Sequence, residues 1–174
     1  MSVIPTRVMV ISDTHEHSLN GANMLDVDVL HTGDLTNFGE LNALRDSIKM
    51  MGTITAELKL YHHSALEIMT GQSAKDAGVT YLKEGTHTFT LKNGAEFTVY
   101  ATPYTCGSMG FQYQINEDRF NDATQIAPGQ TSIATNPIPA GVDIVAAIFS
   151  VLSAVCGHLC TASDTFTKEA VKIL

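Results

Sequence analysis

The 174-residue chain has few basic side chains: ten Lys and Arg stand against eighteen Asp and Glu, for a formal net charge of −8. Proteins that bind nucleic acids generally neutralise phosphates with clustered Lys and Arg. Because the ten basic residues are scattered along the chain, we expect no nucleic-acid partner. An acidic protein that handles a phosphate group can still obtain local positive charge from bound cations.

Cysteine is also scarce, with only Cys106, Cys156 and Cys160 in the chain. An odd number of cysteines, with no secretory leader before the first predicted strand, indicates a reducing, cytoplasmic setting. Cys156 and Cys160 flank His158, but a zinc site built on a cysteine pair usually draws on a second pair. We expect the cysteines to be small buried side chains, with metal ligation and redox pairing as the alternatives.

The chain lacks an apolar run long enough to cross a membrane. Residues 144–157 are apolar apart from two serines, but a membrane-spanning helix needs roughly twenty residues. We expect a buried strand that leads into a core helix, with an exposed apolar tail as the alternative. The hydrophobic content of 44% and charged content of 16% are typical of a globular protein. The length predicts a single domain over residues 1–174.

Strand-like and helix-like segments alternate in the first half of the chain, which predicts an α/β fold with a largely parallel sheet. Apolar residues recur at helical spacing between Phe38 and Met51. The predicted strands are residues 8–12, 27–32 and 57–61, and the predicted helices are residues 38–51 and 64–77.

The second half changes in character. Residues 86–91 and 97–101 read as the two strands of a hairpin, with its turn at Asn93-Gly94. Residues 103–139 are rich in Gly, Asn, Thr and Pro, which is typical of loops over sheet ends. We therefore expect a second, more antiparallel sheet.

Two short motifs near the start carry the chemistry. Ser12-Asp13-Thr14-His15 follows the apolar run Val8 to Ile11, and Thr32-Gly33-Asp34 follows the run Val27 to Leu30. Open α/β sheets build their sites beyond the carboxyl ends of strands, so these carboxylates and this imidazole are expected to meet there. Asp13, His15 and Asp34 therefore predict half of a two-metal centre, in which Asp34 bridges both ions.

At these residues the chain resembles the calcineurin-like metallophosphoesterase superfamily, especially its small single-domain eukaryotic members. The resemblance extends in order over residues 7–145. The matching blocks are Arg7 to His15, Val27 to Thr36 with Gly39, Gly78 to Leu82, Ala101 to Tyr104, and Gly141 to Val145.

The resemblance implies a fold, a ligand set and a reaction. The fold is a shortened αββα sandwich with mixed parallel and antiparallel sheets. Asp13 and His15 match ligands of one metal, and Asp34 matches the carboxylate between two. Such a centre activates a water molecule for attack on a small phosphomonoester or phosphodiester. A mixed carboxylate and imidazole site suits Mn, Fe or Zn, as one or two ions.

The chain departs from the family in the second half of the centre. A Gly-Asn-His-Asp/Glu block is expected after the third strand, but Tyr61 is followed by His62 and His63. A Thr-His-Gly block is missing as well. Of the Gly-His-x-His block only Gly157-His158-Leu159-Cys160 remains, and His158 is the fourth predicted metal ligand.

These departures leave three alternatives open: a catalytically inactive protein that acts by binding only, a centre with replaced ligands, and a gene model that has lost exons. A replacement ligand could come from His62 or His63, at the end of the third strand. For His17 and His31 we expect a surface position or a hydrogen bond that orients a ligand.

Overall fold

The computed structural model describes residues 4–19, 28–61, 66–106, 112–147 and 171–173. The chain divides into two compact units. Unit 1 is Met1–Lys83 with Phe89–Glu96, and unit 2 is Glu84–Thr88 with Phe97–Leu174. The single domain expected from the length stays a prediction.

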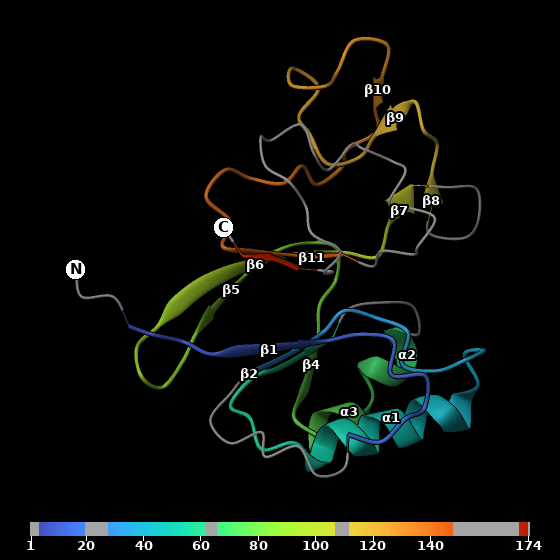
Figure 1. The fold of residues 1–174 in the computed structure, drawn as a ribbon, viewed down its shortest axis with the longest axis vertical. Helices are drawn as coiled ribbons and strands as arrows, with labels where there is room; N and C mark the ends of the chain where they lie inside the picture. Colours follow the sequence, from blue (N-terminus) through green and yellow to red (C-terminus); the bar gives the residue numbers. More distant parts are fainter. Residues whose placement is uncertain (1–3, 20–27, 62–65, 107–111, 148–170, 174) are drawn as a thin grey trace. The chain divides into compact units, whose positions relative to one another are not determined.

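Unit 1 is built on a four-stranded parallel sheet in the order β1-β2-β3-β4 (Figure 1). The pairing brings Ile11, His31, Tyr61 and Tyr81 into one row across the sheet, so the loops after these strands start at one edge. This sheet confirms the α/β fold with parallel strands that the sequence predicts. The strands are β1 (Val8–Ile11), β2 (Asp28–His31), β3 (Lys59–Tyr61) and β4 (Val79–Tyr81).

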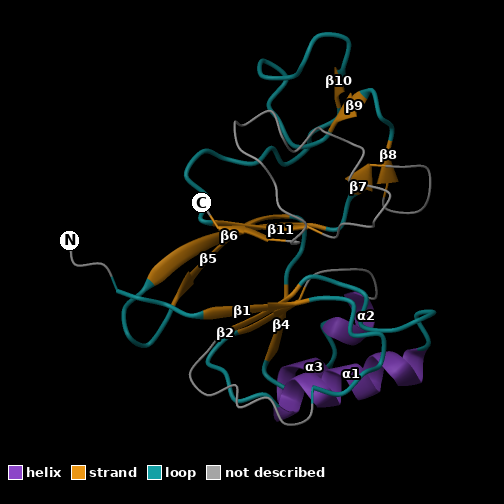
Figure 2. Ribbon diagram, viewed as in Figure 1, coloured by secondary structure: helices purple, strands orange, loops and turns teal. Residues whose placement is uncertain are grey.

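Three helices lie together beside this sheet (Figure 2). They are α1 (Leu41–Thr53), α2 (Leu66–Met69) and α3 (Gln72–Asp76). The apolar residues of α1 that recur at helical spacing point inward, and burial of such a stripe is what holds a short helix in place. The core of unit 1 consists of Val29, Leu35, Leu44, Ile48, Met51, Ile54, Tyr61, Met69, Ala74 and Val79.

The helix predicted over residues 38–51 is wrong at its start. Gly39 has a left-handed backbone (φ +79°) and its amide donates to Thr36 Oγ1, so this turn delays the helix to Leu41. Phe38 is 89% exposed and Leu41 is 58% exposed, so neither joins the core. The apolar face of α1 therefore begins at Leu44.

The helix predicted over residues 64–77 is also wrong as a single element. In the described part of that range, α2 and α3 are separated by Thr70 and Gly71, and Gly71 has an extended ψ of 175°.

The third strand is shorter than predicted as well. It begins at Lys59; before it, the Glu57 carboxylate accepts the Lys92 amide and the Leu58 amide donates to the Asp28 side chain.

A second four-stranded sheet has the order β12-β11-β6-β5. β11 pairs with β6 in parallel and with β12 antiparallel, and β5 and β6 form a hairpin, so the sheet is mixed and, as predicted, more antiparallel than the sheet of unit 1. The predicted hairpin over residues 86–101 is confirmed, with its turn at Leu91–Ala95. The strands are β5 (Gly85–Thr90), β6 (Glu96–Thr102), β11 (Ile144–Ala147) and β12 (Val171–Ile173).

Residues 103–139 contain short strand pairs within otherwise irregular chain, close to the loops that the composition predicts. Arg119 joins part of this region to the rest of unit 2: its guanidinium donates two hydrogen bonds to Glu84 (both 3.0 Å) and lies 3.4 Å from the centre of the Tyr104 ring. The pairs are β7 (Thr105–Cys106) with β8 (Gln112–Tyr113), and β9 (Glu117–Asp118) with β10 (Thr131–Ser132).

Unit 2 has its own core of Tyr100, Tyr113, Phe120 and Val142. Tyr113 and Phe120 meet edge to face, with ring centres 5.4 Å apart. Of the segment that the sequence predicts as a strand leading into a helix, only β11 is described. Within the described residues, no helix has the length and apolar character that crossing a membrane would require.

Candidate metal centre

Main-chain hydrogen bonds join the loops after β1 and β2 beyond the ends of the strands. The amide of Asp13 donates to the Gly33 carbonyl (3.1 Å), and the amide of His15 donates to the Asp34 carbonyl (3.0 Å). The amide of Glu16 continues the series to the Leu35 carbonyl (2.8 Å). The two loops therefore form one connected backbone structure at the carboxyl edge of the sheet.

All three residues of the predicted centre have left-handed backbone. Their φ angles are +53° at Asp13, +43° at His15 and +52° at Asp34, and Glu16 follows at +68°. Elsewhere in the described chain only glycines have positive φ. This conformation costs about 1–3 kcal/mol for a residue with a side chain and persists where the surroundings enforce it, often at functional sites. The bonds between the loops enforce it here.

The side chains of these three residues converge. One ligand atom from each of Asp13, His15 and Asp34 lies within 4.8 Å of the others. His15 Nε2 is 3.8 Å from Asp13 Oδ1. Asp13 is exposed, whereas His15 and Asp34 are partly buried, so the group is open to solvent on one side. Asp13 also accepts a hydrogen bond from the Ser12 hydroxyl.

His31 forms hydrogen bonds with both loops. Its side chain is fully buried, and its Nδ1 accepts the amide hydrogen of Gly33 (3.3 Å). Because Nδ1 is an acceptor, the ring proton of the neutral imidazole is on Nε2, which donates to Thr14 Oγ1 (3.1 Å). His31 thus links Gly33, which precedes Asp34, to Thr14, which lies between Asp13 and His15. His31 is therefore buried rather than at the surface, and it bonds the neighbours of the predicted ligands; that it orients a metal ligand stays a prediction.

Tyr61 lies beside His31, with the ring centres 5.8 Å apart in an edge-to-face arrangement. Burial, together with the charges of Tyr81 and Asp34, raises the pKa of the Tyr61 hydroxyl well above its usual value. Tyr61 therefore stays neutral. It provides an uncharged, close-packed support for His31.

Asn37 ties the outer parts of the two loops together. Its side-chain amide donates to the Glu16 carboxylate (3.1 Å) and to the His15 carbonyl (3.4 Å), while its main-chain amide donates to Glu16 Oε1 (3.1 Å). The backbone of His15 is consequently held from two sides. Sequence reasoning missed Asn37 and Thr14, because their roles depend on contacts between segments about twenty residues apart.

The group Asp13, His15 and Asp34 fits a divalent cation on two grounds. Two carboxylates and one imidazole are a donor set that Mn, Fe and Zn accept. In addition, His15 Nδ1 is buried and has no hydrogen-bond partner among the described residues. A buried polar atom without a partner is costly and calls for an explanation, and an ion bound through His15 Nδ1 would supply one.

The structure does not test the remaining histidines that the sequence offers as ligands, apart from His17. His158, His62 and His63 lie outside the described residues. His17 is exposed and does not belong to the group. In the described part of the chain, Asp13, His15 and Asp34 are the one set of three or more ligand side chains close enough to share a metal ion.

Comparison with known proteins adds no assignment: no protein-family model matches the chain, and no curated protein sequence matches it. The geometry of the two loops is therefore the basis for a function.

Proposed function

We propose that this chain is a metal-dependent phosphoesterase that hydrolyses a small phosphomonoester or phosphodiester. Asp13, His15 and Asp34 hold the divalent cation, which is Mn, Fe or Zn. The observation that carries the proposal is the left-handed backbone at all three ligands, enforced by hydrogen bonds between two loops at the carboxyl edge of a parallel sheet. Strain concentrated at three convergent ligands is expected for a functional site.

The proposed fold is the αββα sandwich of the calcineurin-like metallophosphoesterases, in shortened form. Two features support it: a parallel sheet that carries the ligands after its first two strands, and a second sheet of mixed direction later in the chain. The ligand motifs also occur in the order expected for that superfamily.

The chain's own residues position and hold the reacting groups. Asp13 and Asp34 supply negative oxygen ligands, and His15 supplies a nitrogen ligand that is neutral when it binds a metal. A bound divalent ion would lower the pKa of a coordinated water and offset the charge of the phosphate. His31 keeps its proton at Nε2 and so maintains the loop geometry through Thr14 and Gly33.

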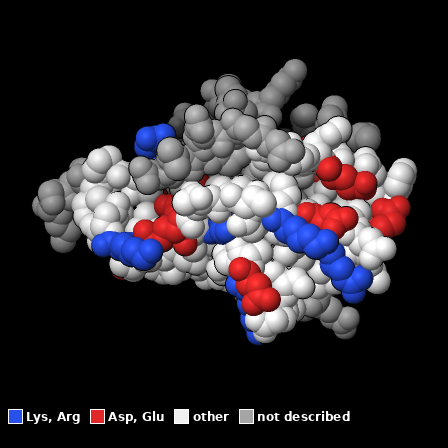
Figure 3. All heavy atoms as spheres, turned by 90° about the horizontal axis from the view of Figure 1, so that it is seen from below, with Lys and Arg blue, Asp and Glu red and all other residues white. Residues whose placement is uncertain are grey.

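The expected substrate is small rather than a nucleic acid. In the face that Figure 3 shows, Lys and Arg side chains stand beside Asp and Glu side chains and do not form an exclusively basic surface. Lys49 and Asp46 illustrate such pairing, with 2.7 Å between Nζ and Oδ1. On this acidic chain, the cation would provide the attraction for phosphate.

The second candidate function is metal-dependent or metal-free binding without catalysis. It is favoured by the small ligand set, since the described residues supply three donors for one ion. A two-ion reaction needs ligands for a second ion. The two candidates make different predictions about hydrolysis, which a single experiment compares.

The test measures metal content and hydrolysis in the full-length protein and in two variants. Asp34→Asn replaces a negative ligand with a neutral amide of the same shape. Asp46→Asn makes the same change on the exposed face of α1 and serves as the matched control. Protein purified without chelators is analysed by metal mass spectrometry, and hydrolysis of bis(p-nitrophenyl) phosphate is followed with Mn²⁺ added.

We expect the unmodified chain and Asp46→Asn to hold at least one ion and to hydrolyse the diester. Loss of a direct ligand should weaken metal binding at least about 100-fold in Asp34→Asn, since even supporting groups around a metal are worth 10–100-fold. Metal binding with no hydrolysis would favour the binding-only function. If Asp34→Asn retained the metal of the unmodified chain, the proposed centre would be wrong.

A further inference from the structure

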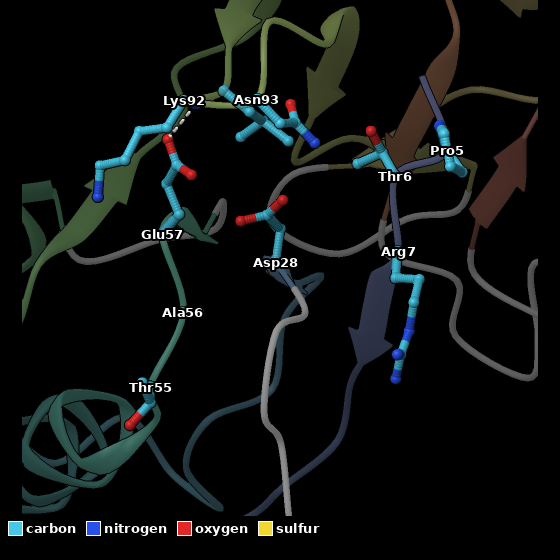
Figure 4. A pocket seen from close by; sticks show the side chains of 10 residues that line it. Pro5, Thr6, Arg7, Asp28, Thr55, Ala56, Glu57, Lys92 and Asn93 are labelled. Carbon is cyan, nitrogen blue, oxygen red and sulfur yellow. Dashed lines mark hydrogen bonds between the residues drawn. The ribbon is translucent and has the colours of Figure 1, made fainter. Parts of the chain in front are cut away.

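A cleft of about 360 Å³ lies in unit 1 at the edge of the parallel sheet opposite the candidate metal centre (Figure 4). It is formed where the strands begin: by the residues before β1, the first residue of β2, the segment before β3 and the turn between β5 and β6. All of these segments belong to unit 1. The volume falls at the small end of the range for ligand sites.

Asp28 occupies the middle of this cleft. The residue as a whole is only 8% exposed, yet its carboxylate points into the open space (Figure 4). Oδ1 accepts the amide hydrogen of Leu58 (2.9 Å). No protein group of the described chain donates to Oδ2. A buried carboxylate normally has a counter-charge or a full set of donors, so half of this group is left to a ligand.

The pKa of Asp28 supports this interpretation. Burial raises the pKa of its carboxyl group above the usual value, and the nearby charge of Glu57 raises it further, against the lowering effect of the Leu58 hydrogen bond. The ionised form is therefore less favourable in the folded protein than in the unfolded chain. The positive charge of a bound cation would offset both effects.

Glu57 places a second carboxylate beside the cleft. It accepts the main-chain amide of Lys92 through Oε1 (2.7 Å), as the dashed line in Figure 4 marks. The protein's own cations do not neutralise the pair: the charged ends of Arg7 and Lys92 point away from Asp28 (Figure 4). Among the described residues, neither forms an ion pair with Asp28 or Glu57.

The remaining walls indicate an organic cation rather than a bare metal ion. Pro5, Ala56 and Leu91 contribute apolar surface, and Thr6 and Asn93 contribute polar groups. A divalent ion prefers six or more oxygen ligands, or imidazole, and the cleft has no histidine. An ammonium group has three hydrogens to donate and is satisfied by few acceptors and water, and an attached carbon chain would cover the apolar walls.

We propose that this cleft binds the ammonium group of a small organic amine, with Asp28 and Glu57 as its acceptors. Asp28 Oδ2 takes one ammonium hydrogen and Glu57 takes another, while the carbon chain lies against Ala56 and Leu91. The site is separate from the metal centre, because Asp28 begins β2 whereas Asp34 follows the end of that strand. It therefore does not depend on the proposed phosphoesterase activity.

Two backbone amides report directly on the proposed acceptors: Leu58 donates to Asp28, and Lys92 donates to Glu57. The experiment titrates ¹⁵N-labelled full-length protein with n-butylamine at neutral pH and follows these two signals by NMR. n-Butanol, which has the same shape without the charge, is the control ligand. Asp28→Asn keeps the acceptor for Leu58 and removes the charge, and Asp46→Asn is the control variant.

We expect saturable shifts of both signals with butylamine and none with butanol, at a Kd of about 1 mM, as befits a ligand of few atoms. The Kd should rise at least about tenfold in Asp28→Asn, a loss of about 1.4 kcal/mol, and stay unchanged in Asp46→Asn and Asp34→Asn. No saturable shift, or an unchanged Kd in Asp28→Asn, would overturn the proposal. Shifts produced by MgCl₂ and not by butylamine would overturn it in favour of a metal site.

Discussion

Two aspartates of the proposed sites stand at opposite ends of strand β2. Asp28 begins the strand and is buried, with one carboxylate oxygen toward a cleft. Asp34 follows the strand and lies close to Asp13 and His15, the other two candidate metal ligands. The same residue type thus meets two environments. Desolvation raises the pKa of Asp28, whereas a left-handed backbone sets the position of the Asp34 side chain.

Removing the charge of Asp28 should stabilise the protein at neutral pH. The folded-state pKa of Asp28 is raised, so between the unfolded pKa and the folded pKa the folded state holds more protons. Stability contributed at this position therefore falls as pH rises through that window. We expect Asp28→Asn to be more stable than the unmodified chain at pH 7 by about 0.5–2 kcal/mol, in the range of other stabilising substitutions.

Urea unfolding at a series of pH values measures this effect. The advantage of Asp28→Asn should shrink as the pH falls through the folded pKa of Asp28, and it should vanish below the ordinary value of 3.8. Asp46→Asn, an exposed change of the same kind, should show no comparable advantage. A destabilised Asp28→Asn at pH 7 would contradict the assignment of the raised pKa.

At the scale of elements, the junction between α1 and β3 depends on one buried cation. The Lys59 ammonium donates to the carbonyls of Met51 (3.2 Å) and Ile54 (3.1 Å) at the carboxyl end of α1. A positive charge is favourable at this end of a helix, where carbonyls lack helical partners. Burial lowers the pKa of the Lys59 amine, which is 7% exposed as a residue.

Replacing Lys59 with Met should destabilise the protein by about 1–3 kcal/mol, because the Ile54 carbonyl would lose its donor in a buried place. Met retains most of the apolar stem, so packing changes little. The measurement is the urea midpoint at neutral pH. Lys49→Met, on the exposed face of α1, is the control and should stay within about 0.5 kcal/mol. If Lys59→Met and Lys49→Met destabilised the protein equally, the hydrogen bonds of Lys59 would not be what stabilises this junction.

At the scale of the whole molecule, each compact unit has its own buried cluster. The cluster around Ile48 and Met51 belongs to unit 1, and the cluster around Tyr100 and Phe120 belongs to unit 2. The proposed metal ligands all belong to unit 1. A ligand stabilises the folded structure that binds it, so bound metal should raise the stability of unit 1 more than that of unit 2.

Hydrogen exchange with and without EDTA tests this expectation. With metal at about 100 times its Kd, amides of unit 1 such as Val29 and Leu60 should gain up to about 2.7 kcal/mol of protection, and EDTA should remove it. Amides of unit 2 such as Val99 and Ala101 should change little. Equal changes in both units would mean that they open as one cooperative structure.

Much of unit 1 was predictable, because its signals are local. Apolar runs placed three strands of the parallel sheet, and Asn93-Gly94 placed the hairpin turn. Helix boundaries were predicted less well: the turn at Gly39 and the extended Gly71 override an apolar spacing that continues through them. β12 was not anticipated, since a short strand depends on its partner β11.

The same division applies to the candidate sites. The sequence alone determined which residue types follow β1 and β2, and from these Asp13, His15 and Asp34 were predicted together, because parallel strands end at one edge. Only the tertiary structure decided that these residues adopt left-handed backbone, that His31 and Asn37 hold the loops, and that Asp28 faces a cleft. Those properties arise from hydrogen bonds and burial between segments far apart in the chain, which no local pattern records.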